Sequence, residues 1–266
     1  MGQGCPILLL HSSMSSKLQW YRLMYRMSHD YHLIAVDLYG YGDSPFPSTN
    51  GKFCIDDEIA LVDSLLEGVL PPDEPLHLVG HSFGGAVALK YCYSAPERFR
   101  SLTLYEPVAF HLLAETEEAL IKTRHMEQFI SQKLEQGDRS TAAEYFIDFW
   151  SGKGTFTSVP REIRLTFEQG INKLKLDFRA LLGEPLTLED YKKIDIPVCL
   201  MAGRKSPIES RRVSELLAET LPNCKLHMVD GGHMAPVNQG EAVNTIIENF
   251  IKGLKSPGMQ TGINCG

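Results

Sequence analysis

The chain has 266 residues, with 26 Lys and Arg against 33 Asp and Glu, so its formal net charge is −7. Hydrophobic residues make up 43% and charged residues 22%, a balance that argues against disorder, coiled coil and membrane spans. The mild acidity argues against a nucleic-acid partner, because neutralising phosphates needs a basic surface.

Six short apolar segments alternate with helical patterns, and this alternation predicts an α/β fold with a mostly parallel sheet flanked by helices. Most of the segments are near-continuous hydrophobic runs, as expected of strands that are covered on both faces. The predicted strands are 6–10, 32–37, 75–80, 101–106, 196–203 and 224–230.

The alternation stops between residues 111 and 190, where the pattern predicts helices and no strand. The expected helices are 115–135, 140–150, 160–168 and 171–182, separated by glycines. Their aromatic residues indicate the core of a small helical subdomain, with the lining of a pocket as the alternative. These residues are Phe129, Tyr145, Phe146, Phe149, Trp150, Phe156, Phe167 and Phe178. The predicted organisation is a sheet domain from 1–110 and 191–255, a helical insert at 111–190 and a flexible tail at 256–266.

A candidate nucleophile stands in Gly80-His81-Ser82-Phe83-Gly84, between an apolar strand and a helical stretch. A G-x-S-x-G turn from strand to helix strains the serine backbone and lifts its hydroxyl above the sheet edge. Glycines are needed on either side because neighbouring backbone crowds those positions. The following helix would direct its free N–H groups at the site.

A serine at neutral pH is a poor nucleophile and needs a base within reach. His233 is the leading candidate, because it lies in a loop after the last predicted strand and before the final helix. Such loops gather at the carboxyl edge of a parallel sheet, where sites in α/β folds form. The other eight histidines fit less well. His81, beside the nucleophile, is expected to point elsewhere.

With these motifs the chain resembles a serine hydrolase of the α/β-hydrolase family, over nearly its whole length. His11-Ser12-Ser13 resembles the family's His-Gly-x oxyanion loop, and residues 37–44 resemble its D-x-x-G-x-G-x-S turn. The resemblance implies that the backbone N–H groups of Ser13 and Phe83 form an oxyanion hole. Two fixed donors there would stabilise the tetrahedral intermediate by about 3 kcal/mol or more.

The third member of a triad departs from the family's usual pattern. The family usually has an Asp three residues beyond the glycine that ends the penultimate strand, where this chain has Ser206. Serine cannot supply the charge that stabilises an imidazolium. Glu106 stands at the end of the preceding core strand, where certain dehalogenases of the family carry their acid. Glu106 is therefore the predicted acid, with Glu209 and a serine-only arrangement through Ser206 as alternatives.

The chain also departs from the family at its start, where we expect the usual antiparallel hairpin of two strands to be missing. The strand at residues 33–36 would then lie at a sheet edge, with unpaired backbone groups that invite association. Another element covers that edge, two chains pair there, or the recorded start is late. Of these, we expect a homodimer, which light scattering would test.

The resemblance implies hydrolysis of a carboxylic ester through an acyl-enzyme, with residues 111–190 as a cap and no metal or organic cofactor. The cap aromatics favour a small-molecule ester with an apolar acyl or aryl part. Alternatives are cleavage of C–C bonds in meta-cleavage products, thioester or lactone hydrolysis, and a non-catalytic ligand-binding or signalling role. The expected location is the cytoplasm and not a membrane, because the six scattered cysteines and the N-terminus fit neither a disulfide framework nor a signal peptide.

Overall fold

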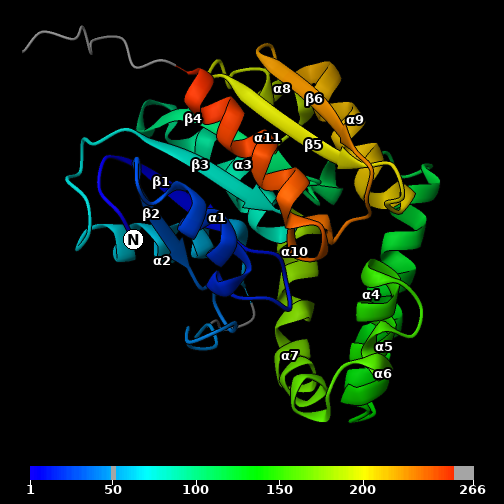
Figure 1. Cartoon of the computed structure of the whole chain (residues 1–266). Coiled ribbons are helices and arrows are strands. Elements are labelled where there is room, and N and C mark those ends of the chain that lie inside the picture. The colour runs from blue at the N-terminus through cyan, green and yellow to red at the C-terminus, as the bar shows by residue number, and fades with distance from the viewer. Residues whose placement is uncertain (49–51, 255–266) are drawn as a thin grey trace, which may run out of the picture.

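The centre of the molecule is a six-stranded sheet in which every strand is parallel to its neighbours (Figure 1). The computed structural model describes residues 1–48 and 52–254, so the predicted tail at 256–266 lies outside the described residues. The strand order is β2-β1-β3-β4-β5-β6. All six predicted strands are present, with ends shifted by two residues at most. They are β1 (Cys5–Leu10), β2 (Tyr31–Val36), β3 (Leu76–His81), β4 (Phe99–Tyr105), β5 (Val198–Gly203) and β6 (Cys224–Val229).

Helices cover both faces of the sheet (Figure 1). In β1, Ile7 and Leu9 pack in the core on one face, while Leu8 and Leu10 pack in the core on the other. This double burial explains why the strand reads as a continuous apolar run. One face is covered by α1 (Tyr21–Met27) and α11 (Gly240–Gly253), and the other by α2 (Ile55–Leu66), α3 (Phe83–Ser94) and α9 (Ile208–Thr220). None of the helices in the described part of the chain is long and apolar enough to cross a membrane.

The segment between β4 and β5 consists of helices joined by short loops. Residues 111–190 are all described and contain no strand, as the sequence predicts. We call this segment the insert. Its elements are η3 (Phe110–Leu112), α4 (Glu118–Glu135), α5 (Arg139–Ser151), α6 (Thr155–Ser158), α7 (Arg161–Gly183) and α8 (Leu188–Tyr191). In Figure 1 its long helices, coloured green, extend away from the sheet to one side of the molecule.

One predicted break within the insert is wrong. The sequence predicts separate helices at 160–168 and 171–182, but α7 runs without interruption through Gly170. The apolar stripe Phe167, Ile171, Leu174 and Phe178 continues at helical spacing across the glycine and packs against the core. A glycine inside a helix costs only about 1 kcal/mol, which this packing offsets.

β2 lies at an edge of the sheet, as predicted, and pairs only with β1 among the described strands. The first residue of the chain covers part of its open side. The Met1 amino group donates to the Leu33 carbonyl oxygen at 2.8 Å, and the Leu33 N–H donates to the Met1 carbonyl oxygen at 2.7 Å. The homodimer stays a prediction.

Candidate active site

Ser82 lies in the turn between β3 and α3, at the carboxyl edge of the sheet. Its backbone has φ 55° and ψ −119°, a conformation that is strained for a serine. A Cβ at Gly80 would lie 2.5 Å from the Gly84 oxygen, and a Cβ at Gly84 would lie 2.4 Å from the His11 oxygen. Both positions therefore require glycine, for the reason that the motif predicts.

The imidazole of His233 lies next to this serine. Its Nε2 is 2.9 Å from the Ser82 Oγ, although the two residues are 151 positions apart in the sequence. The histidine is buried in the loop after β6, and the ring of Trp150 in α5 lies over it with the ring centroids 4.2 Å apart. A base in hydrogen-bond reach of the hydroxyl can take its proton during attack.

Glu106, directly after β4, completes a series of hydrogen bonds with these two residues. Its Oε2 is 2.7 Å from the His233 Nδ1, and its Oε1 accepts the Gly203 N–H at 2.6 Å. Burial by itself would raise the pKa of Glu106, but its interactions with His233 and the hydrogen bond from the Gly203 N–H together outweigh burial and hold the pKa below its usual value. An ionised carboxylate at Nδ1 leaves Nε2 as the acceptor that faces Ser82.

The two alternative acids do not hold this histidine. Both ring nitrogens of His233 are engaged, one by Ser82 and the other by Glu106. Glu209 is buried on α9, where burial raises its pKa, and its Oε1 has no hydrogen-bond partner within the described residues. Ser206 is buried in the turn between β5 and α9.

Two residues that the sequence analysis missed hold the His233 loop. The Nε2 of His81 donates to the His233 carbonyl oxygen at 2.9 Å, and the two rings lie 5.1 Å apart, so His81 takes part in the site after all. Burial lowers the pKa of His81 well below its usual value, so the ring is neutral. The Tyr105 hydroxyl donates to the Gly232 carbonyl oxygen at 2.8 Å. His81 directly precedes Ser82 and Tyr105 directly precedes Glu106, and this adjacency was the only sequence signal for either residue.

The two predicted oxyanion donors lie beside Ser82. Phe83 follows it as the first residue of α3, and Ser13 follows β1 and lines the same cavities as Ser82. Neither backbone N–H makes a hydrogen bond within residues 1–48 and 52–254. The Gly84 N–H donates to the His11 oxygen at 3.1 Å, which ties the start of α3 to the loop after β1. Two unengaged N–H groups at one place form a site for negative charge.

Two cavities of unequal size meet at Ser82. The outer one has a volume of about 370 Å³ and is lined by apolar side chains and hydroxyls, while the inner one has about 20 Å³ and is mostly apolar. Ser13, Ser82, Phe146 and Trp150 line both. Among the described residues, no lysine or arginine lines either cavity. Of the eight aromatic residues predicted for the insert, Phe146, Trp150, Phe167 and Phe178 line these cavities. Phe146, Trp150 and Phe178 also belong to the hydrophobic core, so the core and pocket interpretations both apply to them.

The chain belongs to the α/β-hydrolase fold family, whose model matches residues 6–238. A 2-hydroxymuconate semialdehyde hydrolase of Pseudomonas putida is 27% identical over 94% of this chain and 88% of its own length. A pimeloyl-[acyl-carrier protein] methyl ester esterase of Legionella pneumophila is 24% identical over 94% of this chain and 97% of its own. The solved structure of a carboxylesterase of Bacillus subtilis matches with a TM-score of 0.73 and 21% identity, over 95% of this chain and 86% of that one. These relatives are named as hydrolases that act on different bonds, while another relative, of Bacillus subtilis, is named as a putative 2-succinyl-6-hydroxy-2,4-cyclohexadiene-1-carboxylate synthase. The family and its esterase and lipase members support a hydrolase.

Proposed function

We propose that the protein hydrolyses carboxylic esters through an acyl-enzyme formed on Ser82. The observation that carries this proposal is the continuous series of buried hydrogen bonds from Ser82 through His233 to Glu106, at 2.9 and 2.7 Å. Covalent acyl transfer requires a nucleophile that is hydrogen-bonded to a base, and a third group that orients the base.

In the proposed mechanism the Ser82 Oγ attacks the ester carbonyl carbon while the His233 Nε2 takes its proton. The Glu106 carboxylate stabilises the imidazolium, and the Ser13 and Phe83 N–H groups receive the charge on the carbonyl oxygen. His233 then protonates the leaving alcohol. A water molecule, activated by the same imidazole, attacks the acyl-enzyme and releases the carboxylic acid.

The cavities favour a neutral ester with one small and one larger apolar group. The inner cavity of about 20 Å³ accommodates a group about the size of a water molecule or a methyl. The outer cavity offers the apolar walls of Phe146, Ile147 and Phe167 for the larger group. A methyl ester is among the substrates that fit, and a methyl ester is what the Legionella relative is named for.

Cleavage of a C–C bond is the second candidate, because the Pseudomonas relative is named for 2-hydroxymuconate semialdehyde, a carboxylate. A buried carboxylate needs a cation or several donors. Within the described residues, neither lining contains a lysine or an arginine, so a carboxylate in these cavities would depend on neutral donors such as the hydroxyls of the outer one, and this favours the neutral ester. Thioester and lactone hydrolysis, the non-catalytic role, the homodimer and the cytoplasmic location stay predictions.

The test is turnover of p-nitrophenyl esters of rising acyl length and of methyl esters of long-chain acids, by wild-type protein and by Ser82→Ala. We expect turnover that vanishes in the variant. Fastest hydrolysis of the acetate would place the acyl group in the inner cavity, and preference for methyl esters of long acids would place the alcohol there. Turnover of a meta-cleavage product but of no ester, or ligand binding without turnover, would contradict the proposal.

A further inference from the structure

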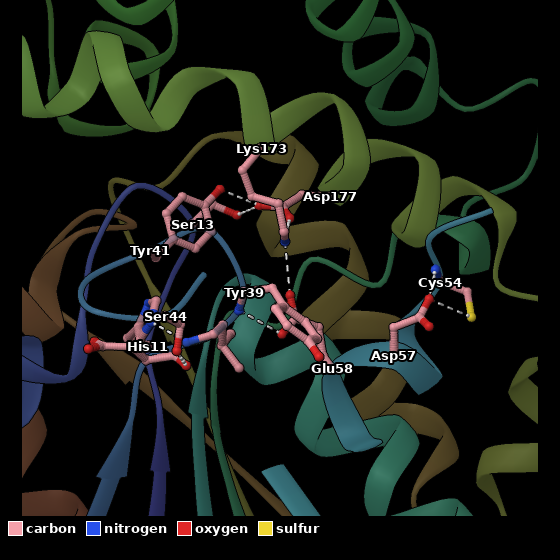
Figure 2. Close-up of polar contacts among 12 residues, drawn as sticks. His11, Ser13, Tyr39, Tyr41, Ser44, Cys54, Asp57, Glu58, Lys173 and Asp177 are labelled. Atoms are coloured by element: carbon pink, nitrogen blue, oxygen red, sulfur yellow. Dashed lines mark hydrogen bonds and ion pairs between the residues drawn. The ribbon is translucent and has the colours of Figure 1, made fainter. Parts of the chain in front are cut away.

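A fully buried group of charged residues joins α7 of the insert to the sheet domain (Figure 2). Lys173 and Asp177 stand one turn apart on α7, and the Lys173 ammonium binds the Asp177 Oδ1 and, at 2.9 Å, the Glu58 Oε1 of α2. Burial by itself would lower the pKa of Lys173, but the attraction of Asp177 and Glu58 outweighs it and raises the pKa. Buried ion pairs are weak contributors to stability relative to apolar packing, so stability alone does not account for this group.

The second oxygen of Asp177 reaches the loop that follows β1. The Ser13 hydroxyl donates to the Asp177 Oδ2 at 2.6 Å, and the Tyr41 hydroxyl donates to the same oxygen at 2.5 Å. With Lys173 at the other oxygen, the carboxylate is held by three donors, as Figure 2 shows. Asp177 is therefore a fixed acceptor that holds the Ser13 side chain from the insert, 164 residues away in the sequence.

The backbone of the same loop is fixed from the opposite side. The Leu38 N–H donates to the His11 Nε2 at 3.0 Å, so the ring proton is on Nδ1, which donates to the Ser12 oxygen at 2.7 Å. The C=O and N–H of a trans peptide point in opposite directions, so this bond also sets the direction of the Ser13 N–H. The next residue, Met14, has φ 59°, a strained conformation that persists only where surrounding contacts impose it.

We infer that Asp177 is a positioning residue for the oxyanion hole, which acts by holding Ser13 so that its backbone N–H stays directed at the carbonyl oxygen of the substrate. The inference rests on the proposed function, because it takes the Ser13 N–H as an oxyanion donor. It gives the insert a part in the chemistry: besides lining the cavities, α7 contributes to stabilising the tetrahedral intermediate through Asp177 and Ser13. The hydroxyl of Ser13 serves as the link and its N–H as the donor.

The test uses Ser13→Ala, which keeps the N–H and removes the link, and Asp177→Asn, which keeps the shape of the side chain. We expect kcat for a p-nitrophenyl ester to fall roughly 10- to 100-fold with little change in KM, because misalignment of a donor weakens only transition-state binding. The affinity for phenylboronic acid, which forms a tetrahedral adduct with a nucleophilic serine, should fall in parallel.

The matched control is Ser101→Ala. Ser101 is fully buried in β4, and its hydroxyl makes a 2.7 Å hydrogen bond with His77, in the half of the sheet that lies away from Ser82. Its loss should lower the melting temperature and leave kcat and boronate affinity unchanged. A merely structural role of Asp177 predicts that Asp177→Asn behaves like this control, and that result would overturn the inference.

The double variant Ser13→Ala/Asp177→Asn separates action through Ser13 from independent action. If Asp177 acts through Ser13, the double variant is no less active than the less active of the two single variants. If the two residues act independently, the fold-losses of the single variants multiply in the double variant. Multiplied losses contradict the inference, as does a wild-type protein that binds no boronate. A separate outcome is a protein that binds the boronate but shows no esterase activity. If that binding is lost in Ser82→Ala and weakened in Ser13→Ala, the result contradicts the proposed function and supports this inference.

Discussion

Ser82, Glu106 and Met14 are the three non-glycine residues with positive φ in the described chain, with values of 55°, 41° and 59°. All three follow strands at the carboxyl edge of the sheet. Such conformations cost about 1–3 kcal/mol each and cluster at functional sites. Here the strain falls on the proposed nucleophile, on the proposed acid and on the residue after the proposed oxyanion loop.

Exchange of Glu106 for Gln should lower kcat/KM for an ester by about 10³- to 10⁴-fold while the fold is retained. The amide cannot stabilise the imidazolium, and its NH₂ group can donate to Nδ1 and so leave His233 in the wrong tautomer. Glu209→Gln is the matched control, since Glu209 is also a buried glutamate near the site but is not bonded to His233. Steady-state kinetics with circular dichroism on both variants would contradict the assignment if Glu209→Gln lost the activity and Glu106→Gln kept it.

The sequence could predict the residues whose requirements are local. The glycines around Ser82 follow from backbone crowding, and the positions of His233 and Glu106 follow from the ends of two predicted strands. His81, Tyr105 and Asp177 could not be predicted, because their roles depend on side-chain directions that tertiary packing sets. For Asp177 the partner, Ser13, lies on a different element 164 residues away.

At the scale of elements, apolar runs were a sufficient signal for strands that are buried on both faces. The signal failed in α7, where Gly170 was interpreted as a break between two helices. A glycine interrupts a helix only if no packing compensates for its entropy, and the stripe on α7 supplies that packing. Composition alone could not show this, because the packing partners, such as Phe156 against Phe167 and Phe110 against Phe178, are brought together only by the tertiary structure.

Gly170→Ala should therefore stabilise the protein by about 0.5–1 kcal/mol, through better helix propensity and a less flexible unfolded chain. The added Cβ would lie 3.6 Å from the Met14 Sδ, an ordinary van der Waals contact. Gly84→Ala is the contrast, because its Cβ would meet the His11 oxygen at 2.4 Å and should lower both stability and activity. Urea denaturation measures the stability of both variants, and ester turnover measures the activity of Gly84→Ala. A Gly170→Ala protein less stable than wild type would refute this account of α7.

At the scale of the whole molecule, the site is assembled from two parts of the chain. The carboxyl edge of the sheet contributes Ser82, Glu106 and His233, while the insert contributes Trp150 over the imidazole and Asp177 at the oxyanion loop. The sequence predicts a helical insert at residues 111–190. It does not indicate how the insert meets the sheet, because cavity volume arises from the fit of two surfaces that no spacing rule describes.

The central claim is that Ser82 carries the acyl group during ester hydrolysis. The most direct measurement is the intact mass of the protein quenched in acid during turnover of p-nitrophenyl acetate, with the early release of p-nitrophenol recorded in parallel. We predict a mass increase of one acetyl group on the wild-type chain, a burst of one equivalent of p-nitrophenol, and neither in Ser82→Ala. Hydrolysis without a covalent adduct, or a Ser82→Ala protein that turns over at the wild-type rate, would contradict the account.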